Sequence, residues 1–129
     1  MSMVLVVDDD PGTRSLVRLL LEIEGHAVVE AAHGEEALNI IGPDLLPDVV
    51  VTDLMMPVLS GLQLIERLHA EPITAAIPIV VVSSDPEAAR ALQTAGAVTA
   101  VVAKPFVASA FAELIRSIST GPMKSAPAA

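Results

Sequence analysis

Short, mainly apolar runs recur along the chain and stop at charged, hydroxyl or small residues. The runs cover residues 3–7, 27–31, 48–52, 79–82 and 100–103. Runs of this length that are rich in valine and isoleucine are typical of strands buried on both faces of a sheet. The pattern therefore predicts five strands.

Helical patterns occupy the intervals between these runs. Asp10 is suited to cap a helix that has Pro11 at its first position. Leu16, Leu20 and Ile23 then share one face of that helix, which a following glycine ends. The other intervals predict helices over residues 34–41, 61–70, 86–94 and 109–119.

Strands and helices alternate five times, so the predicted fold is an α/β unit of the (βα)5 type. Helical crossovers imply parallel strands and right-handed connections, which give a doubly wound five-stranded sheet. We expect one domain over residues 1–119. Residues 120–129 are mainly Gly, Pro, Ser and Ala and predict a flexible C-terminal tail.

Composition narrows the classes of function. Hydrophobic residues make up 53% of the chain, but only two residues are aromatic, both Phe. The core must then be aliphatic, and base stacking on single-stranded nucleic acid is disfavoured. A formal net charge of −9 argues against direct nucleic-acid binding, which needs clustered Lys and Arg. The chain has no cysteine, which excludes disulfides and thiolate metal ligands.

The same composition bears on location. The apolar runs are too short to cross a bilayer, and residues 1–7 lack the basic start and long apolar stretch of a signal peptide. We therefore expect a cytoplasmic protein without membrane contact. The acidic balance has two interpretations: simple solubility, or carboxylates that converge on a cation.

Chemistry-bearing residues stand directly after four of the five predicted strands. Asp8 and Asp9 follow the first strand, Asp53 the third, Ser83 the fourth and Lys104 the fifth. In an open parallel α/β sheet, ligands bind beyond the carboxyl ends of the strands. These side chains are therefore predicted to converge on one crevice.

Each of these residues also has a purely structural interpretation. An Asp at a strand end is often a turn residue or a helix cap, and capping is the preferred role for Asp10. A single serine or lysine at such a place is commonly a loop hydroxyl or a solvated charge. The joint occurrence at four strand ends is what favours a shared site.

Carboxylates crowded at one edge repel one another, and each resists ionisation beside the others. A hard divalent cation such as Mg²⁺ relieves this repulsion, because it prefers oxygen ligands. A carboxylate can also act as a nucleophile toward phosphorus and form an aspartyl phosphate. Lys104 and the Ser83 hydroxyl would then compensate the added charge.

Four segments resemble the receiver domain of two-component response regulators, of the chemotaxis-receiver type. They are VLVVDDD at residues 4–10, VVTDLMMP at 50–57 with Gly61 after it, PIVVVS at 78–83 and KPF at 104–106. The resemblance extends over residues 3–119. It implies a flavodoxin-like fold with the strand order 2-1-3-4-5.

The resemblance implies a Mg²⁺ site at the matching positions. Asp9 resembles the direct metal ligand of the acidic pair, with Asp8 acting through water. Asp53 and the backbone carbonyl of Met55 resemble the remaining protein ligands.

The resemblance also implies a site for a phosphoryl group. Asp53 resembles the phosphoacceptor, Lys104 the lysine that pairs with the phosphoryl group, and Ser83 the hydroxyl residue that turns toward it. Family members often have a cis bond before the proline that matches Pro105.

The implied activity is Mg²⁺-dependent phosphoryl transfer from a phosphohistidine to Asp53, which produces a conformational switch. The donor would be a sensor histidine kinase or a histidine phosphotransfer protein. Such a domain catalyses its own phosphorylation and slow dephosphorylation but is not otherwise an enzyme. The resemblance leaves open the downstream partner, and also a homodimer through the fourth helix, fifth strand and fifth helix.

The chain departs from the family pattern in two places. The family commonly has Tyr, Phe or His three residues before the lysine, where this chain has Val101, or Ala100 if the register shifts. Neither side chain can act as a moving ring. The segment between Ser83 and Gly96 is shorter than usual, which predicts a short or irregular fourth helix.

Two alternatives belong to other classes. A Mg²⁺-dependent phosphohydrolase of the haloacid-dehalogenase type needs a second Asp two residues after its nucleophile, and that position here is Met55. A degenerate receiver would act as a phosphorylation-independent protein-interaction module. The intact acidic and basic residues argue against the degenerate receiver, whereas the missing aromatic residue argues for it.

Overall fold

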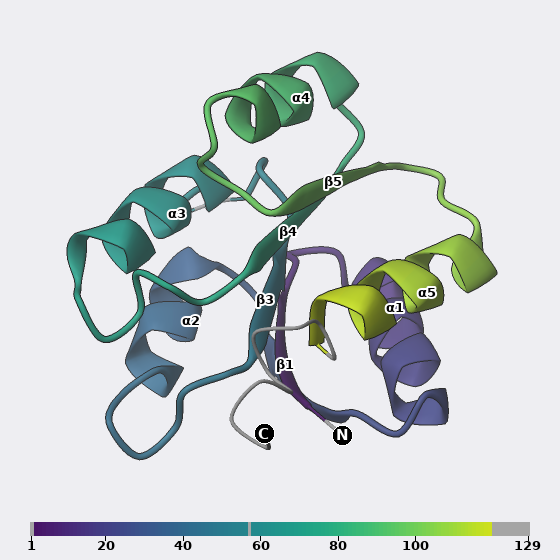
Figure 1. The fold of residues 1–129 in the computed structure, drawn as a ribbon, viewed down its shortest axis with the longest axis horizontal. Coiled ribbons are helices and arrows are strands. Elements are labelled where there is room, and N and C mark those ends of the chain that lie inside the picture. The colour runs from purple at the N-terminus through teal and green to yellow at the C-terminus, as the bar shows by residue number, and fades with distance from the viewer. Residues whose placement is uncertain (1, 57, 120–129) are drawn as a thin grey trace, which may run out of the picture.

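Five parallel strands form one sheet in the order β2-β1-β3-β4-β5. The computed structural model describes residues 2–56 and 58–119, so Pro57 and the predicted tail at 120–129 lie outside the described residues. Helices α1 and α5 cover one face of the sheet, and α2 and α3 cover the other (Figure 1). The predicted doubly wound α/β fold and its strand order are confirmed.

The strands agree with the predicted runs to within one residue. They are β1 (Met3–Val7), β2 (Ala27–Ala31), β3 (Val49–Thr52), β4 (Ile79–Ser83) and β5 (Ala100–Ala103). The expected start of the third strand at Asp48 is wrong. Its carboxylate accepts a hydrogen bond from the N–H of Met3 at 2.8 Å, and its own N–H donates to the Met3 carbonyl at 2.7 Å. Asp48 therefore closes the start of β1 instead of extending β3.

The helices also agree with prediction to within one residue. They are α1 (Pro11–Ile23), α2 (Gly34–Ile40), α3 (Gly61–Ala70), α4 (Pro86–Thr94) and α5 (Ala108–Ser119). Asp10 caps α1 as predicted, because its carboxylate accepts the N–H groups of Gly12 and Thr13 at 3.2 and 3.3 Å. Helix α4 spans nine residues and is regular, so it is short but not irregular.

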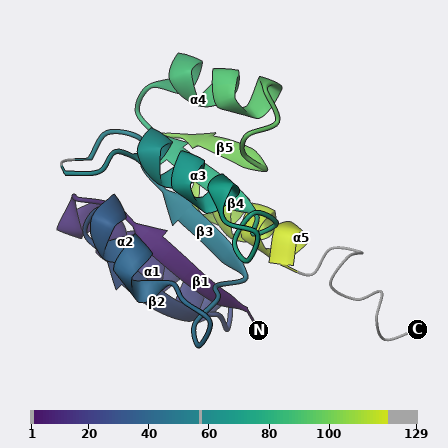
Figure 2. The same cartoon turned by 90° about the vertical axis from the view of Figure 1, so that its left-hand side faces the viewer.

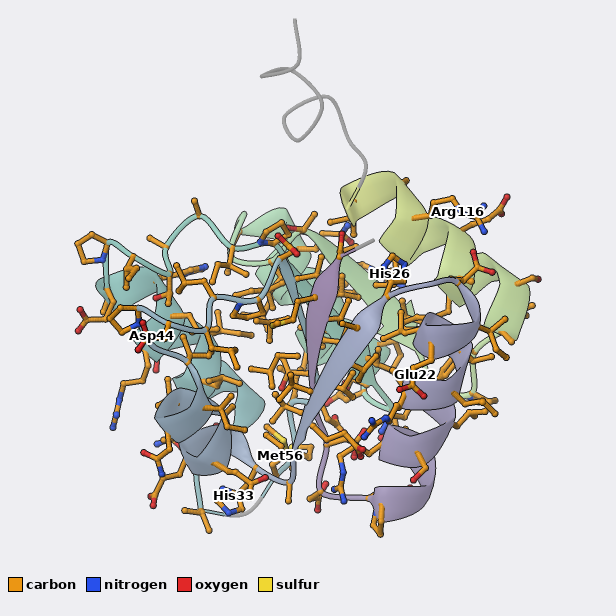
Figure 3. All side chains as sticks on the ribbon, turned by 90° about the horizontal axis from the view of Figure 1, so that it is seen from below. Glu22, His26, His33, Asp44, Met56 and Arg116 are labelled. Atoms are coloured by element: carbon orange, nitrogen blue, oxygen red, sulfur yellow. The ribbon has the colours of Figure 1, made fainter. Side chains whose placement is uncertain are left out.

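The face of α1 that packs on the sheet differs from the stripe expected from periodicity. Val17 and Leu21 are buried and Leu20 packs partly buried beside them, whereas Leu16 and Ile23 are 47% and 70% exposed. Helix α1 carries so many apolar residues that two neighbouring faces satisfy the helical period. Its position beside α5 selects between them, and Figure 3 shows α1, which carries Glu22, next to α5, which carries Arg116.

The sheet separates two aliphatic cores, because successive side chains of a strand point to opposite faces. On β1, Leu5 and Val7 face the core under α2, α3 and α4, whereas Val4 and Val6 face the core under α1 and α5. A strand covered on both faces needs apolar residues at every position, which explains the uninterrupted runs in the sequence. None of the described helices is both long and apolar enough to cross a membrane.

Helix α4 lies at the β5 end of the sheet, outside the two helices that cover the same face (Figure 2). Its contacts are with β4 and β5, and Ala89 is its buried residue. The cap of α4 is Asp85, whose carboxylate accepts the N–H of Ala88 at 3.2 Å. Helix α4 therefore packs on the β4–β5 edge of the sheet through Ala89 and the partly buried Leu92.

Gly61 allows α3 to begin against the peptide that follows β3. Its N–H donates to the carbonyl of Leu54 at 2.9 Å. A Cβ at this position would lie 1.9 Å from the carbonyl oxygen of Asp53 and 2.7 Å from the Cα of Leu54. The backbone of Asp53 therefore packs so closely against Gly61 that any side chain at residue 61 would clash with it.

Substituting Gly61 by alanine should destabilise the fold by about 1–3 kcal/mol or more, because the backbone around Asp53 must move away. Gly42→Ala is the matched control, since a Cβ there meets nothing within 4 Å. Urea unfolding of both variants measures the difference. Equal stability of Gly61→Ala and Gly42→Ala would contradict the close approach.

Candidate functional site

The ends of β1, β3 and β5 bring three acidic residues and one lysine to the same place. Asp8 and Asp9 follow β1, and Asp53 follows β3. One carboxylate oxygen from each of these residues lies within 4.8 Å of the others. Lys104, which follows β5, reaches two of the three carboxylates. These four side chains converge as the strand-end rule predicts.

Asp53 is a nearly buried carboxylate with donors on both oxygens. Its Oδ1 accepts the N–H groups of Leu54 at 2.6 Å and Met55 at 3.4 Å, and its Oδ2 accepts the Lys104 ammonium at 2.9 Å. The backbone N–H of Asp53 donates to the carbonyl of Val7 at 3.1 Å, which fixes the strand end. These donors fix the orientation of the carboxylate and leave both of its oxygens hydrogen-bonded.

Lys104 links the ends of two strands through its ammonium group. Nζ donates to Oδ2 of Asp53 at 2.9 Å and to Oδ2 of Asp8 at 3.2 Å. Partial burial acts to lower the pKa of Lys104, but its hydrogen bonds and charge interactions with the two carboxylates outweigh burial and raise the pKa. The lysine is therefore held protonated. The Lys104–Pro105 peptide bond is cis, as the family resemblance implies.

Asp8 is the more buried member of the acidic pair, with 4% of its surface exposed. Burial raises the pKa of this carboxyl, and the nearby charge of Asp53 adds to the rise. The hydrogen bond from the Asp10 N–H, at 2.9 Å, and the ammonium of Lys104 oppose it. Ionised Asp8 is thus a costly charge in the absence of a further cation.

Asp9 is exposed, in contrast to its neighbour. Within the described part of the chain, its carboxylate takes no hydrogen bond or ion pair, although an oxygen of it lies in the cluster. Its ligand atoms are therefore open to a cation that arrives from solvent.

Ser83 and Met55 lie near this cluster with other contacts. Ser83 is fully buried, and its hydroxyl oxygen accepts the N–H of Asp85 at 3.1 Å. Its carbonyl accepts the N–H of Lys104 at 2.9 Å, which places it beside the lysine. The side chain of Met55 is 73% exposed. The roles expected of the Ser83 hydroxyl and the Met55 carbonyl stay predictions.

Arg14 also contacts the acidic loop, although no motif in the sequence marks it. Its Nη1 donates to the backbone carbonyl of Asp8 at 2.7 Å, and its Nε pairs with Glu30 at 3.0 Å. The sequence offers only a weak indication of this contact, namely that Arg14 lies one helical turn after the three aspartates at residues 8–10. Its partner Glu30 lies on β2, and the sequence alone does not show that this part of β2 lies beside α1.

Val101 lies three residues before Lys104, where the family commonly has an aromatic residue. It packs partly buried against the core under α2, α3 and α4, whereas Ala100 faces the opposite core. Which of the two residues matches the family's aromatic position stays a prediction. A valine there has no ring to move between a buried and an exposed position.

The donor set at this edge fits a hard divalent cation. With every group ionised, three carboxylates and one ammonium leave excess negative charge among closely spaced oxygens. Oxygen ligands of this kind suit Mg²⁺, which is commonly held by one or two carboxylates and waters.

A doubly wound sheet with this strand order, an acidic cluster and a lysine at its carboxyl edge is the architecture of a signal-receiver domain. A family model described as response regulator receiver domain matches residues 4–116. The chain therefore belongs to the response regulator receiver domains of two-component signalling.

Individual relatives agree with this assignment. Protein PilH of Pseudomonas aeruginosa is 34% identical over 84 residues, which are 65% of this chain and 69% of PilH. The structure of chemotaxis response regulator CheY4 of Vibrio cholerae has a TM-score of 0.81 and 28% identity, and covers 92% of this chain and 98% of CheY4.

One solved structure also bears on the metal. Response regulator TrrA of Thermotoga maritima, determined in complex with Mg(2+)-BeF, has a TM-score of 0.80 and 28% identity. The alignment covers 92% of this chain and 99% of TrrA. Other curated relatives are longer than the matched segment, and the chain spans 61%, 12% and 32% of the length of three of them.

Substituting Asp8 by asparagine should stabilise the metal-free fold at neutral pH. The pKa of Asp8 is raised by burial, so the folded state binds this proton more tightly than the unfolded chain does. Its favourable contribution is complete below the ordinary carboxyl pKa and is lost as pH rises through the raised value. Ionised Asp8 therefore costs stability at neutral pH, and asparagine removes that cost while it still accepts the N–H of Asp10.

Thermal unfolding in the presence of a chelator measures this effect. The midpoint of Asp8→Asn should exceed that of the wild type at neutral pH, and the difference should shrink as the pH falls. A lower midpoint for Asp8→Asn at neutral pH would show that the attraction to Lys104 outweighs burial.

Proposed function

We propose that this receiver domain accepts a phosphoryl group on the carboxylate of Asp53, in a reaction that depends on Mg²⁺. The observation that carries the proposal is the place of that carboxylate, among the oxygens of Asp8 and Asp9 and 2.9 Å from the Lys104 ammonium. A carboxylate with a cation beside it is suited to attack a phosphorus whose oxygens carry negative charge. Membership of the receiver family supports this assignment.

The residues that would hold Mg²⁺ are Asp9 and Asp53 directly, the backbone carbonyl of Met55, and Asp8 through water. The exposed carboxylate of Asp9 and the clustered oxygens of all three aspartates support this ligand set. The Mg(2+)-BeF complex of TrrA supports the same ion. When bound, Mg²⁺ would neutralise part of the charge on the transferring phosphoryl oxygens.

In the proposed step, an oxygen of Asp53 attacks the phosphorus in line with the leaving group. A P–O bond to Asp53 forms and the P–N bond to the donor histidine breaks, with its electron pair returning to the imidazole nitrogen. Lys104 then pairs with the transferred oxygens, for which its contacts with Asp8 and Asp53 already place it. The Ser83 hydroxyl uses its oxygen toward Asp85, so its hydrogen is able to donate to the phosphoryl group.

The proposed outcome is a switch between two populated states. Attraction of Ser83 to the phosphoryl group would shift the loops around residues 83–87 and 104–106, which lead into α4 and α5. Since Val101 supplies no moving ring, the output has to use these loops or a partner that reads the charge directly. The domain would catalyse its own phosphorylation and slow dephosphorylation and no other turnover.

The proposed donor is a phosphohistidine on a sensor histidine kinase or a histidine phosphotransfer protein, in the cytoplasm. A homodimer through α4, β5 and α5 remains a hypothesis. The valine at residue 101, where the family commonly has an aromatic residue, favours the alternative of a degenerate receiver that binds its partner without phosphorylation.

Incubation with acetyl phosphate and Mg²⁺ should add the mass of one phosphoryl group to the intact protein. Asp53→Asn should show no addition, because the nucleophilic oxygen is lost. Asp10→Asn is the matched control, since asparagine also caps a helix and Asp10 lies outside the cluster. Intact-mass spectrometry tests this directly, and an addition that survives Asp53→Asn would place the phosphoryl group elsewhere.

Asp9→Asn should weaken Mg²⁺ binding by about tenfold or more, because it removes an exposed charged ligand. Asp10→Asn removes the same charge one residue away and should leave the affinity almost unchanged. Isothermal titration calorimetry with MgCl₂ compares the two variants. Equal affinities would argue that Asp9 contributes only long-range charge.

A further inference from the structure

A salt-bridged arginine connects β2 to the loop that carries the acidic pair. Nε of Arg14 pairs with Oε1 of Glu30 at 3.0 Å, and Nη1 donates to the backbone carbonyl of Asp8 at 2.7 Å. Glu30 lies on β2, and Arg14 lies in the first turns of α1. The guanidinium of Arg14 therefore links β2 to the loop after β1, where it binds the backbone of the candidate metal site.

We propose that Arg14, oriented by Glu30, is a positioning residue that fixes the Asp8–Asp9 peptide so that Asp9 faces the cation. This inference rests on the proposed function above, because it concerns the same Mg²⁺ site. Arg14 would act through the peptide and would not itself contact Mg²⁺ or the phosphoryl group.

The peptide geometry explains how a contact on Asp8 can direct Asp9. The carbonyl that accepts Arg14 belongs to the planar unit that includes the nitrogen of Asp9. On the other side of Asp8, its N–H donates to the carbonyl of Ala31 at 3.1 Å. The exposed side chain of Asp9 takes no partner of its own within the described part of the chain, so its direction depends on this peptide plane.

The chemistry of the side chain matters as well as its charge. An arginine presents Nε and Nη1 in a rigid planar fork, so it can hold a carboxylate and a carbonyl together. A lysine has a single nitrogen on a flexible stem and cannot reproduce both bonds in that geometry. Glu30 also pairs with Arg18 at 2.5 Å, which leaves it fixed between two guanidinium groups.

The charge of Arg14 and its contact with the acidic loop predict opposite effects of its removal on Mg²⁺ affinity. By charge alone, Arg14 repels a cation, so removing it would strengthen Mg²⁺ binding. By position, removing it frees the Asp8–Asp9 peptide and weakens binding. The sign of the change in affinity therefore separates the two effects.

The test is calorimetric titration of the whole chain with MgCl₂, for the wild type, Arg14→Gln, Arg14→Lys and Arg18→Gln. We expect Arg14→Gln and Arg14→Lys each to raise the Kd by about tenfold, as for other residues that orient metal ligands. Arg18→Gln removes an equal charge that shares Glu30 but has no hydrogen bond to the acidic loop, and should change the Kd less than twofold.

Thermal unfolding with a chelator accompanies each titration, because a merely structural role would lower stability without a selective loss of affinity. Arg14→Lys keeps the positive charge and the aliphatic part of the side chain, so it provides the test if Arg14→Gln does not fold. An Arg14 variant that is folded and binds Mg²⁺ as tightly as the wild type, or more tightly, would overturn the positioning role. A wild type that binds no Mg²⁺ would instead overturn the proposed function.

Discussion

The bridge that the Lys104 ammonium makes between Asp8 and Asp53 is the interaction on which the site depends. It spans the ends of β1, β3 and β5, which are brought together by the order of the sheet. Without it, three aspartates would face one another with no fixed counter-charge. With it, Asp53 has an ammonium group within hydrogen-bond distance, while the exposed Asp9 leaves the cluster open to a cation.

The rest of the fold keeps these charges in place. Both faces of the sheet are covered by aliphatic cores, so the strand ends move little relative to one another. Gly61 lets α3 press against the peptide after Asp53, and Arg14 holds the peptide after Asp8. Helix α4, which begins shortly after Ser83, packs against β4 and β5 at the edge of the sheet.

Much of this arrangement could be predicted from the sequence because it depends on local patterns. Apolar runs mark the strands, and the strand-end rule places Asp8, Asp53 and Lys104 at one edge. The packed face of α1 could not be predicted, because its abundant leucines satisfy more than one face and the neighbouring α5 decides. The contact between Arg14 and Glu30 was also beyond the sequence, since it needs the relative placement of a helix and an adjacent strand.

A crystal structure of the protein with Mg²⁺ and beryllofluoride tests most directly whether Asp53, Asp9 and Lys104 form one phosphoryl site. We expect beryllium bonded to a carboxylate oxygen of Asp53, with Mg²⁺ against Asp9 and Lys104 beside the fluorines. Beryllofluoride bound at another residue, or Lys104 turned away from an occupied site, would contradict it.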